Sequence, residues 1–269
     1  MTGQLDIGAA TPHTFQRPAG PIAALTAGPA DGPVVLLVPG FTGSKEDFGP
    51  ILDDIGAAGL RVVAIDLPGQ YESPGRGDFS VDALGEAVRD VASTLADRVH
   101  LLGHSFGGFV ARAAVIASPA QFGTLTLMDS GPAGIDGGRR ARIDRLRPVL
   151  IEHGLAAVYE AMTSEPDYVA GPPDVEAFLH KRFLASDPDG LLAMGNGVID
   201  EPDRVAALRA TGLPVLVLTG VDDDAFPPSG QAEMAQRLGA SFVEIADAAH
   251  SPAVDNPPAT AAALIRFWT

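Results

Sequence analysis

The chain of 269 residues contains no cysteine. A disulfide framework, a thiol nucleophile and a cysteine-ligated zinc site are therefore excluded. Long apolar runs are also absent, because no stretch approaches the roughly 18 residues that a membrane-spanning helix needs. Residues 1–6 lack the basic and apolar regions of a signal peptide. We therefore expect a cytoplasmic protein with no membrane span.

Positive charge is scarce, with 18 Lys and Arg against 34 Asp and Glu and a net charge of −16. A protein that neutralises nucleic-acid phosphates or lies on an anionic membrane needs a basic surface, so we expect neither partner. The one basic cluster predicts the solvated face of a helix, since its arginines fall on more than one side: Arg139, Arg140, Arg142, Arg145 and Arg147. With 46% hydrophobic residues, the chain can build the core of one large α/β domain.

The pentapeptide GHSFG at residues 103–107 places Ser105 between two spaced glycines. An apolar run, 99–102, precedes it and an Ala-rich stretch, 109–117, follows, which predicts a strand, a sharp turn and a helix. Small residues two positions from the serine permit a strained turn that lifts its hydroxyl above the sheet. The helix N-terminus there favours developing negative charge. The alternative is a Gly-rich turn with an incidental serine, so a base and an orienting group must be sought elsewhere.

His250 is the histidine, of six, with the context of a catalytic base. It follows the predicted strand at 242–245 and precedes a predicted helix at 257–268, and loops at strand ends often carry catalytic side chains. A surface loop histidine is the alternative. Acid candidates follow the apolar run 213–220, which is typical of a buried parallel strand, and another acid closes the predicted strand at 124–129. These candidates are Asp222, Asp223, Asp224 and the rival Asp129.

The order serine, acid, histidine, each after a strand, resembles that of the α/β-hydrolase superfamily, in particular its capped serine esterases and lipases. Residues 34–44 (VVLLVPGFTGS) are similar to the family's strand and oxyanion loop, and residues 62–69 to its next strand and turn. The family's acid lies three residues after the glycine that ends its strand. The resemblance therefore implies a triad and two backbone oxyanion donors, with no metal or cofactor required: Ser105, Asp223 and His250, with the N–H groups of Phe41 and Phe106.

Two segments depart from the family's pattern. Many relatives have His-Gly before the oxyanion loop, where this chain has Pro39-Gly40, so a histidine that often buttresses the loop is missing. Many relatives have Gly-x-Gly-x-Ser after the next strand, where residues 69–73 here read GQYES. We expect these bulkier and more polar residues near the mouth of the pocket.

Predicted strands alternate with predicted helices along most of the chain. The helical segments 44–58 and 80–95 each carry apolar residues at i, i+3, i+4 and i+7. Such alternation predicts an α/β fold with a mostly parallel sheet of about eight strands and helices on both faces. The strands are expected at about 22–27, 33–38, 61–66, 99–104, 124–129, 214–219 and 241–246.

The alternation breaks once, between about residues 132 and 200. A structureless loop of this length is unusual in a compact domain, so a helical insertion is expected. In the family, an insertion at this position is a cap, which gives a core of residues 1–131 and 201–269 and a cap of residues 132–200. Apolar side chains of the cap are candidates for the substrate pocket, with packing inside the cap as the alternative: Tyr159, Met162, Phe178, Phe183, Leu184 and Met194.

Three functional hypotheses remain. The resemblance implies hydrolysis of a small or medium carboxylic ester through an acyl-enzyme; in this fold, dehalogenases and epoxide hydrolases use aspartate rather than serine. Residues 40–44 are also similar to the loop of the pyruvate-eliminating lyase of menaquinone synthesis, so a lyase or C–C hydrolase is an alternative. Its dicarboxylate would need basic side chains, for which Arg112, Arg139 and Arg182 are candidates. The third is a binding protein for a small ligand on a hydrolase fold, which turnover would separate from an enzyme.

Overall fold

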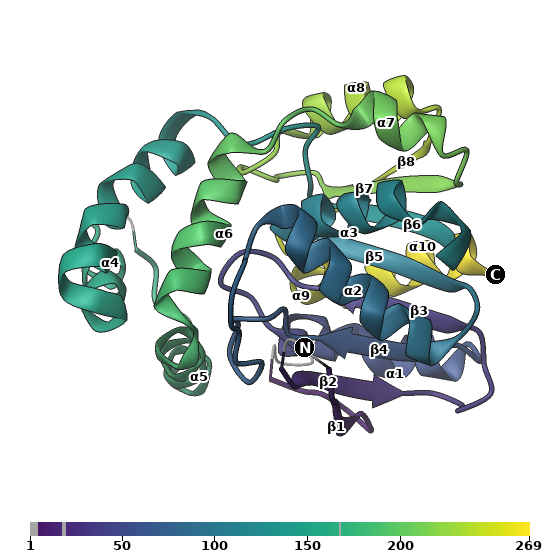
Figure 1. The fold of residues 1–269 in the computed structure, drawn as a ribbon, viewed down its shortest axis with the longest axis horizontal. Coiled ribbons are helices and arrows are strands. Elements are labelled where there is room, and N and C mark those ends of the chain that lie inside the picture. The colour runs from purple at the N-terminus through teal and green to yellow at the C-terminus, as the bar shows by residue number, and fades with distance from the viewer. Residues whose placement is uncertain (1–4, 18–19, 167) are drawn as a thin grey trace.

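The computed structural model describes residues 5–17, 20–166 and 168–269. Residues 1–4, which the expectation about the N-terminus uses, lie outside this part. Eight strands form one sheet in the order β1-β2-β4-β3-β5-β6-β7-β8 (Figure 1). The second strand pairs antiparallel with the first and the fourth, and all other neighbours are parallel. The strands are β1 (Thr11–Phe15), β2 (Ile22–Ala27), β3 (Val34–Val38), β4 (Arg61–Ile65), β5 (Val99–His104), β6 (Phe122–Met128), β7 (Val215–Gly220) and β8 (Ser241–Ile245).

The central strands are mostly apolar because both faces of the sheet are covered. Successive side chains point to opposite faces. Leu36 and Leu101 accordingly belong to one buried cluster, and Leu37 and Leu102 to the other. This double packing holds the central strands rigidly and fixes where their carboxyl ends lie. The mostly parallel sheet predicted from the sequence is confirmed.

Helices form the two outer layers. Four helices pack into the apolar cluster on one face of the sheet: α2 (Val81–Leu95), α3 (Phe106–Ala117), α7 (Val205–Ala210) and α8 (Pro228–Leu238). Three helices pack into the cluster on the other face: α1 (Gly49–Ala57), α9 (Pro252–Asp255) and α10 (Pro257–Trp268). Two short 3₁₀ turns, η1 (Lys45–Phe48) and η2 (Pro119–Gln121), complete the core. Among the described residues, no helix has both the length and the apolar character that crossing a membrane requires.

The break in alternation corresponds to three helices that lie together beside the sheet (Figure 1). They are α4 (Gly137–Thr163), α5 (Pro173–Ala185) and α6 (Pro188–Asp200). The first is two helices joined at Gly154, whose φ of 78° is not helical. The insertion therefore consists of four helical segments, and they extend away from the layers that cover the sheet.

One strand lacks a clear signal in the sequence. β1 carries Pro12, and its first four residues are exposed, so it shows neither an apolar run nor a regular alternation. It pairs only with β2, at the edge of the sheet, where a proline is tolerated.

Candidate active site

Ser105 occupies a strained turn between β5, which ends at His104, and α3. Its φ of 53° and ψ of −120° lie in a region that non-glycine residues seldom adopt. The Ser105 N–H donates to the Met128 carbonyl at 2.8 Å, which ties the turn to β6. A Cβ at Gly107 would lie 2.4 Å from the Pro39 carbonyl oxygen, so only glycine lets α3 start this close to the neighbouring loop. The sharp turn expected from the GHSFG sequence is present.

Three side chains from distant parts of the chain form one hydrogen-bonded series. His250 Nε2 lies 3.0 Å from Ser105 Oγ, and His250 Nδ1 lies 2.9 Å from Asp223 Oδ1. The serine follows β5, the aspartate follows β7 and the histidine follows β8. Because the carboxyl ends of these parallel strands share one edge of the sheet, the three loops meet there. An imidazole held in this way can accept a proton from the serine while the carboxylate fixes its tautomer.

The carboxyl group of Asp223 is well suited to remain ionised. It accepts hydrogen bonds from the backbone N–H groups of Ala225 and Phe226 and from Gln231 Nε2. Burial alone would raise the pKa of Asp223, but the hydrogen bond and charge of His250 and the two backbone donors together lower it below the ordinary value. Its neighbours Asp222 and Asp224 are exposed to solvent, as expected.

Asp129, the rival acid, is close to the triad but is not hydrogen-bonded to His250. It is fully buried, and its Oδ1 accepts from the Gly220 N–H at 2.9 Å and from the Thr219 hydroxyl at 3.2 Å. Burial, together with the negative charge of Asp223, raises the pKa of Asp129 well above its ordinary value. The surroundings of Asp129 therefore favour its neutral form, whereas those of Asp223 favour the ionised form.

The same three groups could in principle hold a metal ion. Asp129, Asp223 and His250 offer ligand atoms within 4.8 Å of one another. Metal ligands must be deprotonated, and the raised pKa of Asp129 disfavours that form. Asp223 and His250 are already hydrogen-bonded to each other. The donor set therefore fits a proton relay better than a metal centre.

Two backbone N–H groups flank Ser105. Phe41 follows β3, and within the described residues its N–H has no hydrogen-bond acceptor. Phe106 is the first residue of α3, where helical N–H groups have no acceptor inside the helix. Phe41 and Ser105 line the same cavity. The N–H groups of Phe41 and Phe106 are the two that the resemblance predicts as donors to an oxyanion.

His104 is hydrogen-bonded to the backbone of the loop that carries His250, a contact that the sequence did not indicate. It is buried, and its Nε2 donates to the His250 carbonyl at 2.7 Å. Burial, with the nearby His250 ring, lowers the pKa of His104 to about 4. A neutral imidazole is thus retained at pH 7, and it holds the backbone of His250 in place. The one signal in the sequence is a histidine at the variable position just before the serine.

A cavity of about 890 Å³ lies between Ser105 and the inserted helices. Of the six apolar residues named as pocket candidates, Met162 and Phe183 line the cavity. Tyr159 and Met194 lie elsewhere: the Tyr159 ring packs on His180 and Phe183, and Met194 is fully buried in the core. The lining also excludes Phe178 and Leu184 and includes other apolar side chains of the insertion: Ile143, Leu146, Leu150, Val158, Leu191 and Val198.

The basic cluster on α4 was predicted as a solvated helix face, but four of its five arginines line the same cavity: Arg139, Arg142, Arg145 and Arg147. Arg142 and Arg145 share Glu165, and Arg139 pairs with Asp224. The other two arginines considered for a dicarboxylate are also paired, Arg112 with Glu201 and Arg182 with Asp47. All three candidate guanidinium groups therefore already have carboxylate partners.

Comparison with known proteins identifies the family of this chain. The sequence pattern of the alpha/beta hydrolase family matches residues 35–263. RutD of Variovorax paradoxus (strain S110), assigned by name to the carbamate hydrolases, is 30% identical over 225 residues, which span 78% of this chain and 82% of that protein. The monoacylglycerol lipase of Mycolicibacterium smegmatis is 28% identical over 228 residues, 79% of this chain and 78% of that protein.

A solved structure is similar over nearly the whole chain. The thermophilic esterase from Thermogutta terrifontis superimposes with a TM-score of 0.77 and 25% identity, covering 97% of this chain and 98% of that one. The match includes the inserted helices as well as the sheet, because it leaves only a few per cent of either chain uncovered. The chain therefore belongs to the alpha/beta hydrolase family and is a hydrolase enzyme.

Proposed function

We propose that this hydrolase cleaves small or medium carboxylic esters through an acyl-enzyme on Ser105. The observation that carries the proposal is the continuous series from Ser105 Oγ through His250 to Asp223, with contacts of 3.0 and 2.9 Å, at a cavity that both Ser105 and His250 line. A strained serine bonded to a histidine is costly to maintain and is needed for nucleophilic catalysis, not for binding alone. The similarity to a named esterase and a named lipase supports the same class of substrate.

In the proposed reaction, His250 Nε2 takes the proton from Ser105 as Oγ attacks the ester carbonyl carbon. Asp223 holds the imidazole in the correct tautomer and stabilises the imidazolium that forms. The carbonyl oxygen becomes negative and is stabilised by the N–H groups of Phe41 and Phe106, each worth about 3 kcal/mol in the transition state. The alcohol leaves with the proton from His250. Water then attacks the acyl-enzyme by the same route and releases the carboxylic acid.

We propose that residues 132–200 act as a cap that selects the acyl group. The apolar side chains of α4 and α6 form the side of the cavity that faces Ser105. Their hydrophobic contacts favour an apolar acyl chain, and a volume of about 890 Å³ accommodates a small or medium one. The lyase alternative has less support. Its dicarboxylate substrate would need basic side chains, and the three candidate arginines are paired with carboxylates of the protein.

Turnover of p-nitrophenyl esters from acetate to decanoate tests the proposal, with a p-nitrophenyl carbamate added because of the similarity to RutD. Ser105→Ala should keep the wild-type melting temperature and lose about a thousandfold or more of kcat. Ser251→Ala is the matched control, because Ser251 lines the same cavity next to His250 and makes no side-chain cap to α9. Unchanged turnover in Ser105→Ala would refute the proposed function.

A further inference from the structure

The peptide unit between Gly40 and Phe41 has two functional ends. Its N–H is the proposed oxyanion donor, and its carbonyl, on Gly40, accepts a hydrogen bond from Gln70 Nε2 at 2.8 Å. We propose that Gln70 is a positioning residue: its side-chain amide fixes and polarises the peptide unit that stabilises the oxyanion. This role rests on the proposed function and adds to it a residue that never touches the substrate.

The peptide unit lies directly against the nucleophile. A Cβ placed on Gly40 would be 3.1 Å from Ser105 Cβ. A peptide bond is planar, so the direction of its carbonyl determines the direction of its N–H. A hydrogen bond to the carbonyl also polarises the whole unit and makes the N–H a stronger donor. Gln70 therefore acts on the oxyanion through a single rigid group.

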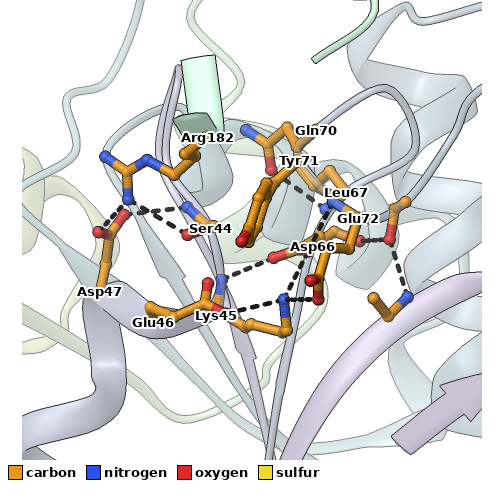
Figure 2. Close-up of polar contacts among 12 residues, drawn as sticks. Ser44, Lys45, Glu46, Asp47, Asp66, Leu67, Gln70, Tyr71, Glu72 and Arg182 are labelled. Atoms are coloured by element: carbon orange, nitrogen blue, oxygen red, sulfur yellow. Dashed lines mark hydrogen bonds and ion pairs between the residues drawn. The ribbon is translucent and has the colours of Figure 1, made fainter. Parts of the chain in front are cut away.

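The orientation of the Gln70 amide is determined by its second contact. Gln70 is fully buried, and its Oε1 accepts a hydrogen bond from the Leu67 N–H at 3.1 Å (Figure 2). Because a backbone N–H can only donate, the side-chain oxygen must face Leu67 and the NH₂ group must face Gly40. Turning the amide around would break both hydrogen bonds in a buried site, which is costly.

The turn that carries Gln70 is itself held to the segment after the oxyanion loop. Lys45 is buried; its N–H donates to Asp66 Oδ1 at 2.7 Å and its Nζ lies 3.0 Å from Asp66 Oδ2. Figure 2 shows this pair beside Gln70, with Glu72 on the same ammonium group. The ion pair and the glutamine thus join the same two loops at two points, which leaves the Gln70 amide in place before any substrate binds.

The local sequence explains why a side chain is needed here. Pro39, at the position where the sequence lacks a buttressing histidine, has no N–H and no polar side chain with which to hold the loop. Besides Gln70, the Gly40 carbonyl accepts only the Gly43 N–H, at 3.0 Å, among the contacts of the described residues. Loss of the Gln70 contact therefore leaves the carbonyl paired, so folding should survive while the peptide unit gains freedom to rotate.

The test compares Gln70→Met and Gln70→Glu with the wild type, using the best ester of the panel. Methionine is similar in length and has no donor; glutamate keeps an acceptor for Leu67 but, when ionised, offers no donor to Gly40. We expect kcat to fall about 10- to 100-fold, less than the loss of a whole oxyanion donor, with KM nearly unchanged. The inhibition constant of an aryl trifluoromethyl ketone, whose adduct carries the oxyanion, should rise by the same factor as kcat/KM falls. The affinity for the carboxylic acid product should not change.

Gln121→Met is the matched control, because the Gln121 amide also donates to a backbone carbonyl, that of Arg89 at 2.8 Å, at the opposite end of the strands. It should leave kcat and the ketone affinity at wild-type values. The role of Gln70 is refuted if Gln70→Met keeps kcat, or if ketone and product affinities fall together. Failure of the proposed function gives a different result: the wild type and Ser105→Ala would hydrolyse every ester equally slowly. In that case the proposed role of Gln70 would be refuted as well.

Discussion

At the residue scale, two carboxyl groups lie next to one imidazole, and their surroundings shift their pKa values in opposite directions. Asp223 receives three N–H donors besides the His250 contact and stays ionised. Asp129 is more deeply buried and faces the charge of Asp223, and both effects raise its pKa and favour its neutral form. Only the ionised group can stabilise an imidazolium, so position along the chain does not decide which aspartate orients His250; local hydrogen bonding does.

Replacing each aspartate by asparagine separates the two roles. Asp223→Asn should lower kcat by about 10⁴-fold, because the neutral amide no longer holds the tautomer and charge of His250. Asp129→Asn should lower it less than about tenfold, since an amide resembles a protonated carboxyl and asparagine tolerates the φ of 46° at this site. Steady-state kinetics with melting temperatures checks both. A larger loss of rate in Asp129→Asn, at equal melting temperature, would make Asp129 the orienting acid.

At the element scale, the inserted helices shape the cavity and are tied to the core at defined points. Arg182 on α5 pairs with Asp47 beside the oxyanion loop, and the Asp187 N–H donates to the Gly69 carbonyl at 2.9 Å. Gly154 lets α4 bend so that its second half still lines the cavity through Val158 and Met162. The bend and these contacts set the depth of the apolar space above Ser105.

Met162 should therefore influence acyl chain length. Met162→Ala enlarges the cavity and should shift kcat/KM toward longer esters, by up to about tenfold per methylene accommodated, whereas Met162→Phe should shift it toward shorter ones. Ile151→Ala is the control, because Ile151 lies on the same helix, is 65% exposed and does not line the cavity. The ratio of decanoate to butyrate turnover measures the effect. Equal ratios in Met162→Ala and Ile151→Ala would exclude α4 from substrate selection.

Elements with strong periodic or apolar patterns could be predicted from the sequence, and those set by tertiary contacts could not. The runs that form β3, β5 and β7 are buried on both faces and therefore mostly apolar, and their predicted bounds agree with the structure within about two residues. β1 is exposed and carries a proline, so no such pattern marks it.

Side-chain placement at the site was less accessible to sequence reasoning. Ser105 and His250 could be proposed from the turn motif and its context, because strand ends determine their positions. The pocket expectation included Tyr159, which packs on other residues of the insertion, and Met194, which is fully buried in the core, because helical periodicity does not say which apolar face meets a cavity. Gln70 was expected near the pocket mouth, yet it is buried beneath the oxyanion loop, because its contact with Gly40 depends on how two separate turns pack.

At the scale of the whole molecule, one rigid sheet brings together residues 145 positions apart in the chain. Five parallel pairings align the carboxyl ends of the strands from β4 to β8, and the triad loops leave from that edge. The sheet is packed on both faces, so these loops have little freedom to separate. This arrangement predicts that Ser105 is activated before a substrate binds.

Labelling with a fluorophosphonate, followed by intact-mass and peptide mass spectrometry, tests this claim most directly. The wild-type protein should acquire one adduct, located on the peptide that contains Ser105, because only an activated serine attacks phosphorus rapidly. His250→Ala should slow the labelling strongly while leaving the melting temperature near that of the wild type. An adduct on any other residue, or no adduct on the folded wild-type protein, would contradict the account.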